Sequence, residues 1–267
     1  MIKTYKNYVN NKFVRSESGF THTTHLGGES KNLPNSSRKD LRDAIVSAEN
    51  SFASWMESDP YLKSQIIFRV YEYLDSREEE FRKISSYLPE GDQVYDKLKE
   101  LLLTYAGLAD KTPSLFSHIN PVAKGYLSTS FPEPLGNTVL YIDNTFLIDG
   151  ISTLLAIIAT GNVVTVLADP LSSIFLLTFS EILAVSDLPS GVVNILSLPD
   201  YSLLKTAAGH RQVRAIEISK IPQNEKELLY PLTVENLKHV IQSNELPPLE
   251  KMRLFTQIKT IWQTIGY

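Results

Sequence analysis

Residues Phe131–Leu196 read FPEPLGNTVLYIDNTFLIDGISTLLAIIATGNVVTVLADPLSSIFLLTFSEILAVSDLPSGVVNIL. Short runs of β-branched and other apolar residues in this segment predict buried strands, at Val139–Ile142, Val163–Leu167 and Val192–Leu196. Longer helical patterns separate these runs, at Leu147–Thr160 and Pro170–Val185. Strands and helices that alternate in this way form a parallel sheet covered by helices on both faces, with right-handed crossovers. The segment therefore predicts an α/β fold with a Rossmann-like, doubly wound parallel sheet.

The alternation continues for one more unit after this segment. Asp200–Ala208 has a helical pattern, and Val213–Ile218 is another β-branched run. Prolines then interrupt the chain around one or two helices, and a final apolar run follows at Thr256–Trp262. If this run is a strand, Ile258, Thr260 and Trp262 share one of its faces.

Amphipathic helices are predicted in the part of the sequence that precedes the sheet. Apolar residues spaced by four and three positions indicate a first helix with one buried face, at Leu41, Ile45, Ala48, Phe52 and Trp55. Ser36 and Ser37 are suitable caps for its start. Similar patterns cover residues 62–74 and 98–108. Residues 1–35 lack sustained periodicity and predict an arm of short strands.

The composition excludes several classes of protein. The chain has 267 residues, of which 43% are hydrophobic, and a net charge of −4 without long charged blocks. A nucleic-acid-binding surface is therefore not expected. No segment has the uncharged apolar run of about 20 residues that spans a bilayer, and no secretory leader pattern is present. We expect a cytoplasmic protein that contacts no membrane.

Motifs for catalysis and for metal binding are missing from the sequence. The chain contains no cysteine, which excludes thiol catalysis and thiolate zinc sites. His22 and His25 lie close together but lack a third clustered ligand, so no metal site is expected. No phosphate-binding glycine loop and no Gly-x-Ser-x-Gly motif occur.

Four segments, in sequence order, resemble the aldehyde dehydrogenase superfamily. They are Asn7–Gly19 (NYVNNKFVRSESG), Tyr105–Asp110 (YAGLAD), Leu188–Asn194 (LPSGVVN) and Thr256–Ile261 (TQIKTI), together with the strand and helix pattern between them. The resemblance implies a truncated member that has the cofactor-domain half and the C-terminal oligomerisation strand but no catalytic domain.

This resemblance divides the chain into five parts. They are an N-terminal arm and helical layer of the cofactor-type domain at 1–125, an oligomerisation hairpin at 126–138, a Rossmann-like core at 139–219, a helical connection at 220–253 and a C-terminal oligomerisation strand at 254–267.

The positions that carry the family's chemistry have changed in this chain. Thr145 stands where the family has the asparagine that helps to hold the oxyanion, and removing such an amide costs about 3 kcal/mol of transition-state stabilisation. Leu167 and Pro170 stand at the lysine and glutamate positions that hold the adenosine ribose. Residues 216–219 read IEIS where a glycine-containing turn would hold the pyrophosphate. We therefore expect no NAD binding in the family's mode, and no other cofactor.

The resemblance also implies a function. In the family, the hairpin and C-terminal strand of one subunit pack on the catalytic domain of its neighbour, and this chain has no room for that domain between 219 and 256. We expect a catalytically inactive subunit that assembles with a full-length aldehyde dehydrogenase through Ile258, Thr260 and Trp262. A homo-oligomeric structural protein is a further possibility. The alternative from another class is a small-molecule or nucleotide-binding protein, or a residual oxidoreductase, that uses the crevice at the carboxyl ends of the strands.

Overall fold

A computed structural model describes residues 3–145 and 147–265 of the protein. Its centre is a seven-stranded sheet in the order β12-β11-β8-β9-β10-β2-β3. The five parallel strands are β8 (Asn137–Ile142), β9 (Val163–Ala168), β10 (Val193–Ser197), β11 (Ala215–Glu217) and β12 (His239–Ile241). Two short antiparallel strands, β2 (Asn7–Val9) and β3 (Lys12–Val14), extend the sheet beyond β10. The predicted α/β fold with a Rossmann-like parallel sheet is confirmed.

The order of the strands places a switch point at the centre of the sheet. The chain starts at β8, moves outward through β9 to β10, and then crosses back to β11 on the other side of β8. Open α/β sheets bind ligands where the strand order reverses, at the carboxyl ends of the strands. The carboxyl ends of β8 and β11 therefore define the candidate ligand crevice.

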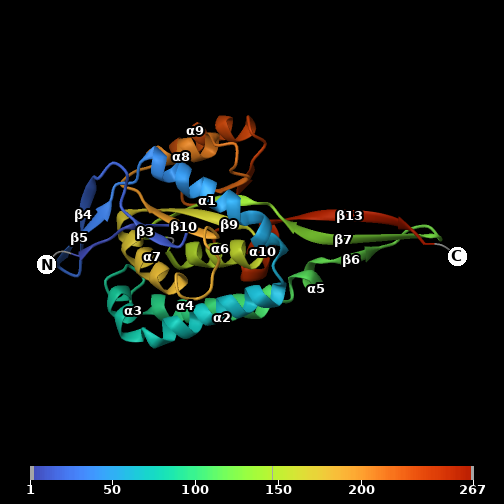
Figure 1. The fold of residues 1–267 in the computed structure, drawn as a ribbon, viewed down its shortest axis with the longest axis horizontal. Coiled ribbons are helices and arrows are strands. Elements are labelled where there is room, and N and C mark those ends of the chain that lie inside the picture. Colours follow the sequence, from blue (N-terminus) through green and yellow to red (C-terminus); the bar gives the residue numbers. More distant parts are fainter. Residues whose placement is uncertain (1–2, 146, 266–267) are drawn as a thin grey trace.

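Helices cover both faces of the sheet, as Figure 1 shows. One face carries α6 (Leu147–Ala159) and α7 (Pro170–Leu183), and the other carries α1 (Arg38–Glu57), α8 (Ser202–Gly209) and α9 (Gln223–Val234). The inner strands β8, β9 and β10 are buried along their whole length because both of their faces are covered.

A second helical layer lies outside α6 and α7. It contains α2 (Pro60–Ser76), α3 (Glu78–Ser85) and α4 (Gln93–Ala109). The Tyr105 hydroxyl of α4 lies 2.9 Å from the Ser152 hydroxyl of α6, which fixes this layer to the core. The helices within 1–125 do not all lie together: Leu41 and Ile45 of α1 pack on the opposite face of the sheet, in one cluster with Val139 and Leu167, whereas Ala48 and Trp55 belong to the larger apolar cluster.

The N-terminal arm forms a separate small sheet beside α7. Its strands are β1 (Lys3–Thr4), β4 (Thr21–Leu26) and β5 (Glu29–Pro34), in the order β1-β5-β4. Gly27 and Gly28 form the turn between β4 and β5, and both have positive φ angles.

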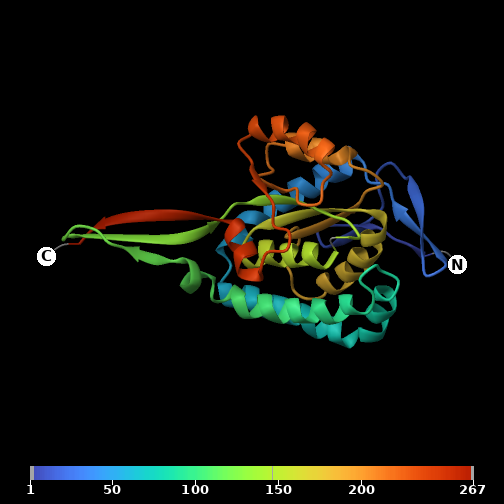
Figure 2. The same ribbon diagram turned by 180° about the vertical axis from the view of Figure 1, so that it is seen from behind.

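A third sheet projects from the body of the molecule at the opposite end from the N-terminus (Figures 1 and 2). Its strands are β6 (His118–Asn120), β7 (Tyr126–Pro134) and β13 (Thr256–Thr264), in the order β13-β7-β6. A short helix precedes this sheet on each chain segment, namely α5 (Thr112–Phe116) before β6 and α10 (Pro248–Leu254) before β13.

Two of the expected segment boundaries differ from the structure. The predicted hairpin at 126–138 omits β6 and includes the first two residues of β8, which belongs to the central sheet. The predicted helical connection at 220–253 contains α9 and α10 but also β12, which pairs in parallel with β11. In the predicted strand segment 254–267, β13 ends at Thr264, and residues 266–267 lie outside the described residues. Among the helices of the described residues, none has the length and hydrophobicity needed to cross a bilayer.

Candidate functional site

A buried carboxylate, Glu217, lies at the switch point. It is the last residue of β11, and its side chain is fully buried. The Ser243 backbone N–H donates to Glu217 Oε1 at 3.1 Å, and the Ser219 N–H donates to Oε2 at 3.1 Å. The hydroxyls of both serines also donate to Oε1. Burial raises the pKa of Glu217, and these hydrogen bonds act in the opposite direction.

The hydrogen bonds continue from Glu217 to a buried lysine on α10. The Ser243 and Thr153 hydroxyls lie 2.9 Å apart, and Lys251 Nζ donates to Thr153 Oγ1 at 3.1 Å. Lys251 also donates to Asp149, at 2.5 Å to Oδ1 and at 3.1 Å to the backbone carbonyl. Burial lowers the pKa of Lys251, while the hydrogen bond and the charge of Asp149 raise it.

This Glu217–Lys251 network, defined as Glu217, Ser243, Thr153, Lys251 and Asp149, joins the ends of β11 and β12 to α6 and α10. Except for Asp149, its members are fully buried. The crevice at the switch point is therefore filled by polar side chains of the chain itself. No sequence pattern identified the network partners of Glu217, because Ser243 and Thr153 lie far from it in the sequence.

Carboxylate side chains also accept hydrogen bonds from the backbone N–H groups that follow β8, β9 and β10. Asp143 accepts hydrogen bonds from the Thr145 N–H at 3.0 Å and from its hydroxyl at 2.8 Å. Asp169 accepts the Ser172 N–H at 2.8 Å at the start of α7, and Asp200 accepts the N–H of Ser202, the first residue of α8, at 2.8 Å. Helix N-termini bind phosphates through free N–H groups. These N–H groups already have negatively charged partners.

Leu167 and Pro170, which by resemblance stand at the family's ribose-binding positions, offer no polar side chain to a ligand. Leu167 is fully buried in the apolar cluster beneath α1 and α8, together with Val139 and Leu196. Pro170 is the first residue of α7, and Asp169 is its cap. The residues present at the carboxyl ends of the strands therefore do not fit NAD in the expected mode.

The hydroxyl of Thr145 is not available to donate a hydrogen bond to an oxyanion. Its hydroxyl donates to Asp143, so a second acceptor could take this proton only if that hydrogen bond broke. Within residues 3–145 and 147–265, no group of three His, Cys, Asp or Glu side chains could hold a metal ion.

The predicted interface residues lie on one face of β13. Ile258 is 53% exposed and Trp262 is 64% exposed, although both are large apolar residues. Thr260 lies between them and makes a 2.8 Å hydroxyl contact with Ser130 of β7. β13 pairs with β7 along its full length and is an edge strand of its sheet. Its second edge has no strand partner in the part of the chain that the structure describes.

Comparison with known families identifies the protein's relatives. The model of the "Aldehyde dehydrogenase family" matches residues 20–219. The chain belongs to the aldehyde dehydrogenase family.

Curated members of the aldehyde dehydrogenase family are similar over most of this chain. Hydroxyisobutyraldehyde dehydrogenase of Mycolicibacterium austroafricanum is 25% identical over 230 residues, which are 83% of this chain and 45% of that protein. Malonate-semialdehyde dehydrogenase of Bacillus pumilus is 21% identical over 224 residues, 80% of this chain and 46% of its own length. The chain thus spans less than half the length of these relatives.

Solved aldehyde dehydrogenase structures show the same fold. A structure of the enzyme from Bacillus cereus superposes with a TM-score of 0.80 at 21% identity, and covers 89% of this chain and 50% of that one. Betaine aldehyde dehydrogenase from Staphylococcus aureus gives a TM-score of 0.79 at 15% identity, over 88% of this chain and 48% of its own. The chain spans about half the length of these structures.

Proposed function

We propose that the protein is a catalytically inactive aldehyde dehydrogenase-like subunit that assembles with a full-length aldehyde dehydrogenase. The observation that carries this proposal is the Glu217–Lys251 network, which fills the switch point with the chain's own polar groups. A ligand in this crevice would have to displace a buried carboxylate and a buried ammonium from their hydrogen-bond partners. Leaving such groups unpaired costs several kcal/mol each.

The chemical groups of the reaction also support inactivity. The sequence contains no cysteine, so it supplies no thiolate for a covalent intermediate with an aldehyde. Thr145 donates its hydroxyl to Asp143, and a carboxylate beside this position disfavours the developing negative charge of an oxyanion. Both features act against acyl transfer at the end of β8.

The projecting sheet supports assembly with a partner. β13 exposes Ile258 and Trp262 and has a free edge within the described residues. A long edge strand with exposed apolar side chains pairs readily with another chain. A full-length aldehyde dehydrogenase carries the catalytic domain on which, by resemblance, such a strand packs, whereas this chain does not. Heteromeric assembly therefore accounts for the exposed strand better than a homodimer does.

The alternative function, a nucleotide-binding protein or residual oxidoreductase, requires the Glu217–Lys251 network to open. The carboxylates of Asp143, Asp169 and Glu217 would also repel a phosphate.

Two assays test the proposal. The purified protein should oxidise none of a panel of short aliphatic and aromatic aldehydes with NAD or NADP above the level of a mock purification. Co-expressed with a full-length aldehyde dehydrogenase of the same genome, it should elute in a common complex. Turnover by the isolated protein would contradict inactivity, and separate elution from every such enzyme would contradict the assembly.

A further inference from the structure

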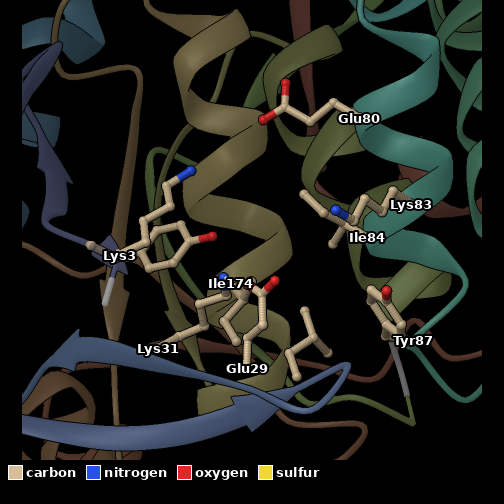
Figure 3. Close-up of a pocket in the computed structure, with 10 residues that line it drawn as sticks. Lys3, Glu29, Lys31, Glu80, Lys83, Ile84, Tyr87 and Ile174 are labelled. Atoms are coloured by element: carbon tan, nitrogen blue, oxygen red, sulfur yellow. Dashed lines mark hydrogen bonds and ion pairs between the residues drawn. The ribbon is translucent and has the colours of Figure 1, made fainter. Parts of the chain in front are cut away.

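A small pocket lies at the opposite end of the molecule from β13, between the N-terminal sheet and the outer helical layer (Figures 1 and 3). Strands β1 and β5 form one wall, α3 and the segment after it form the other, and α7 lies behind. The volume of the cavity is about 160 Å³. None of its lining residues belongs to the Glu217–Lys251 network, so the pocket does not depend on the proposed function.

The inner surface of the pocket is apolar. Ile174 of α7 is fully buried, and Leu26 of β4 is 7% exposed. Ile84 of α3 completes this surface, and the rings of Tyr5 and Tyr87 border it. An apolar surface of this kind accommodates a short hydrocarbon chain.

Three lysines surround the entrance, and Figure 3 shows that they come from opposite walls. Lys3 and Lys31 belong to β1 and β5, and Lys83 belongs to α3. Lys3 Nζ lies 4.6 Å from the centre of the Tyr5 ring. The Lys83 ammonium makes no hydrogen bond or ion pair with any residue that the structure describes, although its backbone carbonyl accepts the Ser86 hydroxyl. The pocket therefore contains at least one ammonium group that an anion could bind directly.

The two carboxylates of the pocket are already neutralised. Glu29 forms an ion pair with Lys31, and the hydrogen bond from Lys31 lowers the pKa of Glu29, with a smaller contribution in the same direction from the charge of Lys83. Arg77 donates to Glu80 at 2.8 Å. Lys3 has only a 3.8 Å contact with Glu181, which Arg77 binds more closely at 2.7 Å. Lys3 and Lys83 therefore give the entrance an excess of positive charge.

The walls of the pocket are held in place by the turn between β4 and β5. Gly27 has a φ angle of 58°, and a Cβ atom at this position would lie 2.5 Å from the Tyr87 ring. The turn thus packs directly against the residue that follows α3. This contact fixes the distance between the wall that carries Lys3 and the wall that carries Lys83.

We propose that this pocket binds an organic carboxylate with a short apolar chain. Lys3 and Lys83 hold the carboxylate at the entrance, and the chain contacts Leu26, Ile84 and Ile174. Since one water-sized group occupies about 30 Å³, the cavity holds roughly five such groups, which suits a carboxylate of four to six carbons.

The probe for this site is sodium pentanoate, titrated into the full-length protein by isothermal titration calorimetry. We expect one saturable site with a Kd of about 1 mM. Acetate should bind at least about tenfold more weakly, because each buried methylene contributes about fourfold. Pentanamide, which has the chain without the charge, should also bind about tenfold more weakly.

Variants of Lys3 and Lys83 test the assignment of the charge. Lys83→Gln and Lys3→Gln should each weaken pentanoate binding by about tenfold, and Lys83→Arg should restore it to near the wild-type value. The matched control is Lys205→Gln, because Lys205 has nearly the same exposure as Lys3 but lies on α8, outside the pocket. It should bind pentanoate like the wild type, and melting temperatures confirm that all variants fold.

Three results would overturn the proposal. They are no saturable binding of pentanoate, equal binding of pentanamide and pentanoate, and unchanged pentanoate affinity in both lysine-to-glutamine variants.

Discussion

Replacing Lys251 by methionine tests the energetic role of the Glu217–Lys251 network. The Lys251 ammonium is fully buried and donates three hydrogen bonds, two to Asp149 and one to Thr153. Methionine keeps the unbranched shape but removes the charge. Breaking one partner of a buried ion pair costs about 3–5 kcal/mol. Because the Asp149 side chain is 28% exposed and water can reach it, we expect the lower end of this range, about 3 kcal/mol.

The assay for this variant is thermal unfolding at neutral pH. A loss of about 3 kcal/mol should lower the melting temperature by about 6–12 °C in a chain of this size. Lys259→Met is the matched control, because Lys259 pairs with Glu133 at a similar distance, 2.7 Å, on an exposed surface. That pair should contribute less than about 1 kcal/mol. Equal melting temperatures for Lys251→Met and Lys259→Met would refute the reasoning.

Three further predictions concern the backbone, the buried carboxylate and the cofactor. Gly191→Ala should lower the free energy of unfolding by more than about 2 kcal/mol, because φ is 86° and the new Cβ atom would lie 2.6 Å from the Ser47 carbonyl oxygen. Gly209→Ala is the control, because a Cβ atom there meets open space, and it should leave the free energy of unfolding unchanged in urea. Folding raises the pKa of Glu217, so the folded protein holds this proton more tightly than the unfolded chain does. The stability of the wild type should therefore fall, relative to that of Glu217→Gln, as the pH rises from below 4.5 through the raised pKa. Parallel profiles of stability against pH for the two proteins would contradict this. Millimolar NAD should leave the melting temperature unchanged. A site with a Kd of about 10 μM would add about 2.7 kcal/mol of stability at a hundredfold excess of NAD, so the assay would detect it. A clear rise in melting temperature would favour the nucleotide-binding alternative.

Local patterns predicted the central architecture because they report burial directly. The stripe on α1 is buried at Leu41, Ile45, Ala48 and Trp55, as its helical spacing indicated. Asp169 and Pro170 start α7 because an acceptor before the helix and a proline at its first position both favour that start. The first three strands of the sheet were recognised from their continuous apolar runs.

The parts that the sequence did not reveal depend on distant contacts. β12 has only three residues, and two of them are exposed at the edge of the sheet, so it lacks the apolar run of an inner strand. Glu217 meets Ser243, and Lys251 meets Asp149, only after α6, β11, β12 and α10 have packed together. No spacing rule within one element reports such pairs. The side of the sheet on which α1 lies was hidden for the same reason.

We propose that the exposed face of β13 binds a full-length aldehyde dehydrogenase. The direct measurement is native mass spectrometry of the two chains, co-expressed and purified through a tag on the full-length enzyme. We predict a heteromeric complex that is lost when residues 256–267 are deleted or when Trp262 is replaced by glutamate. The Val234→Glu control, at a residue of α9 that is 70% exposed, should leave the complex intact. A complex of undiminished abundance with the truncated chain would contradict the account.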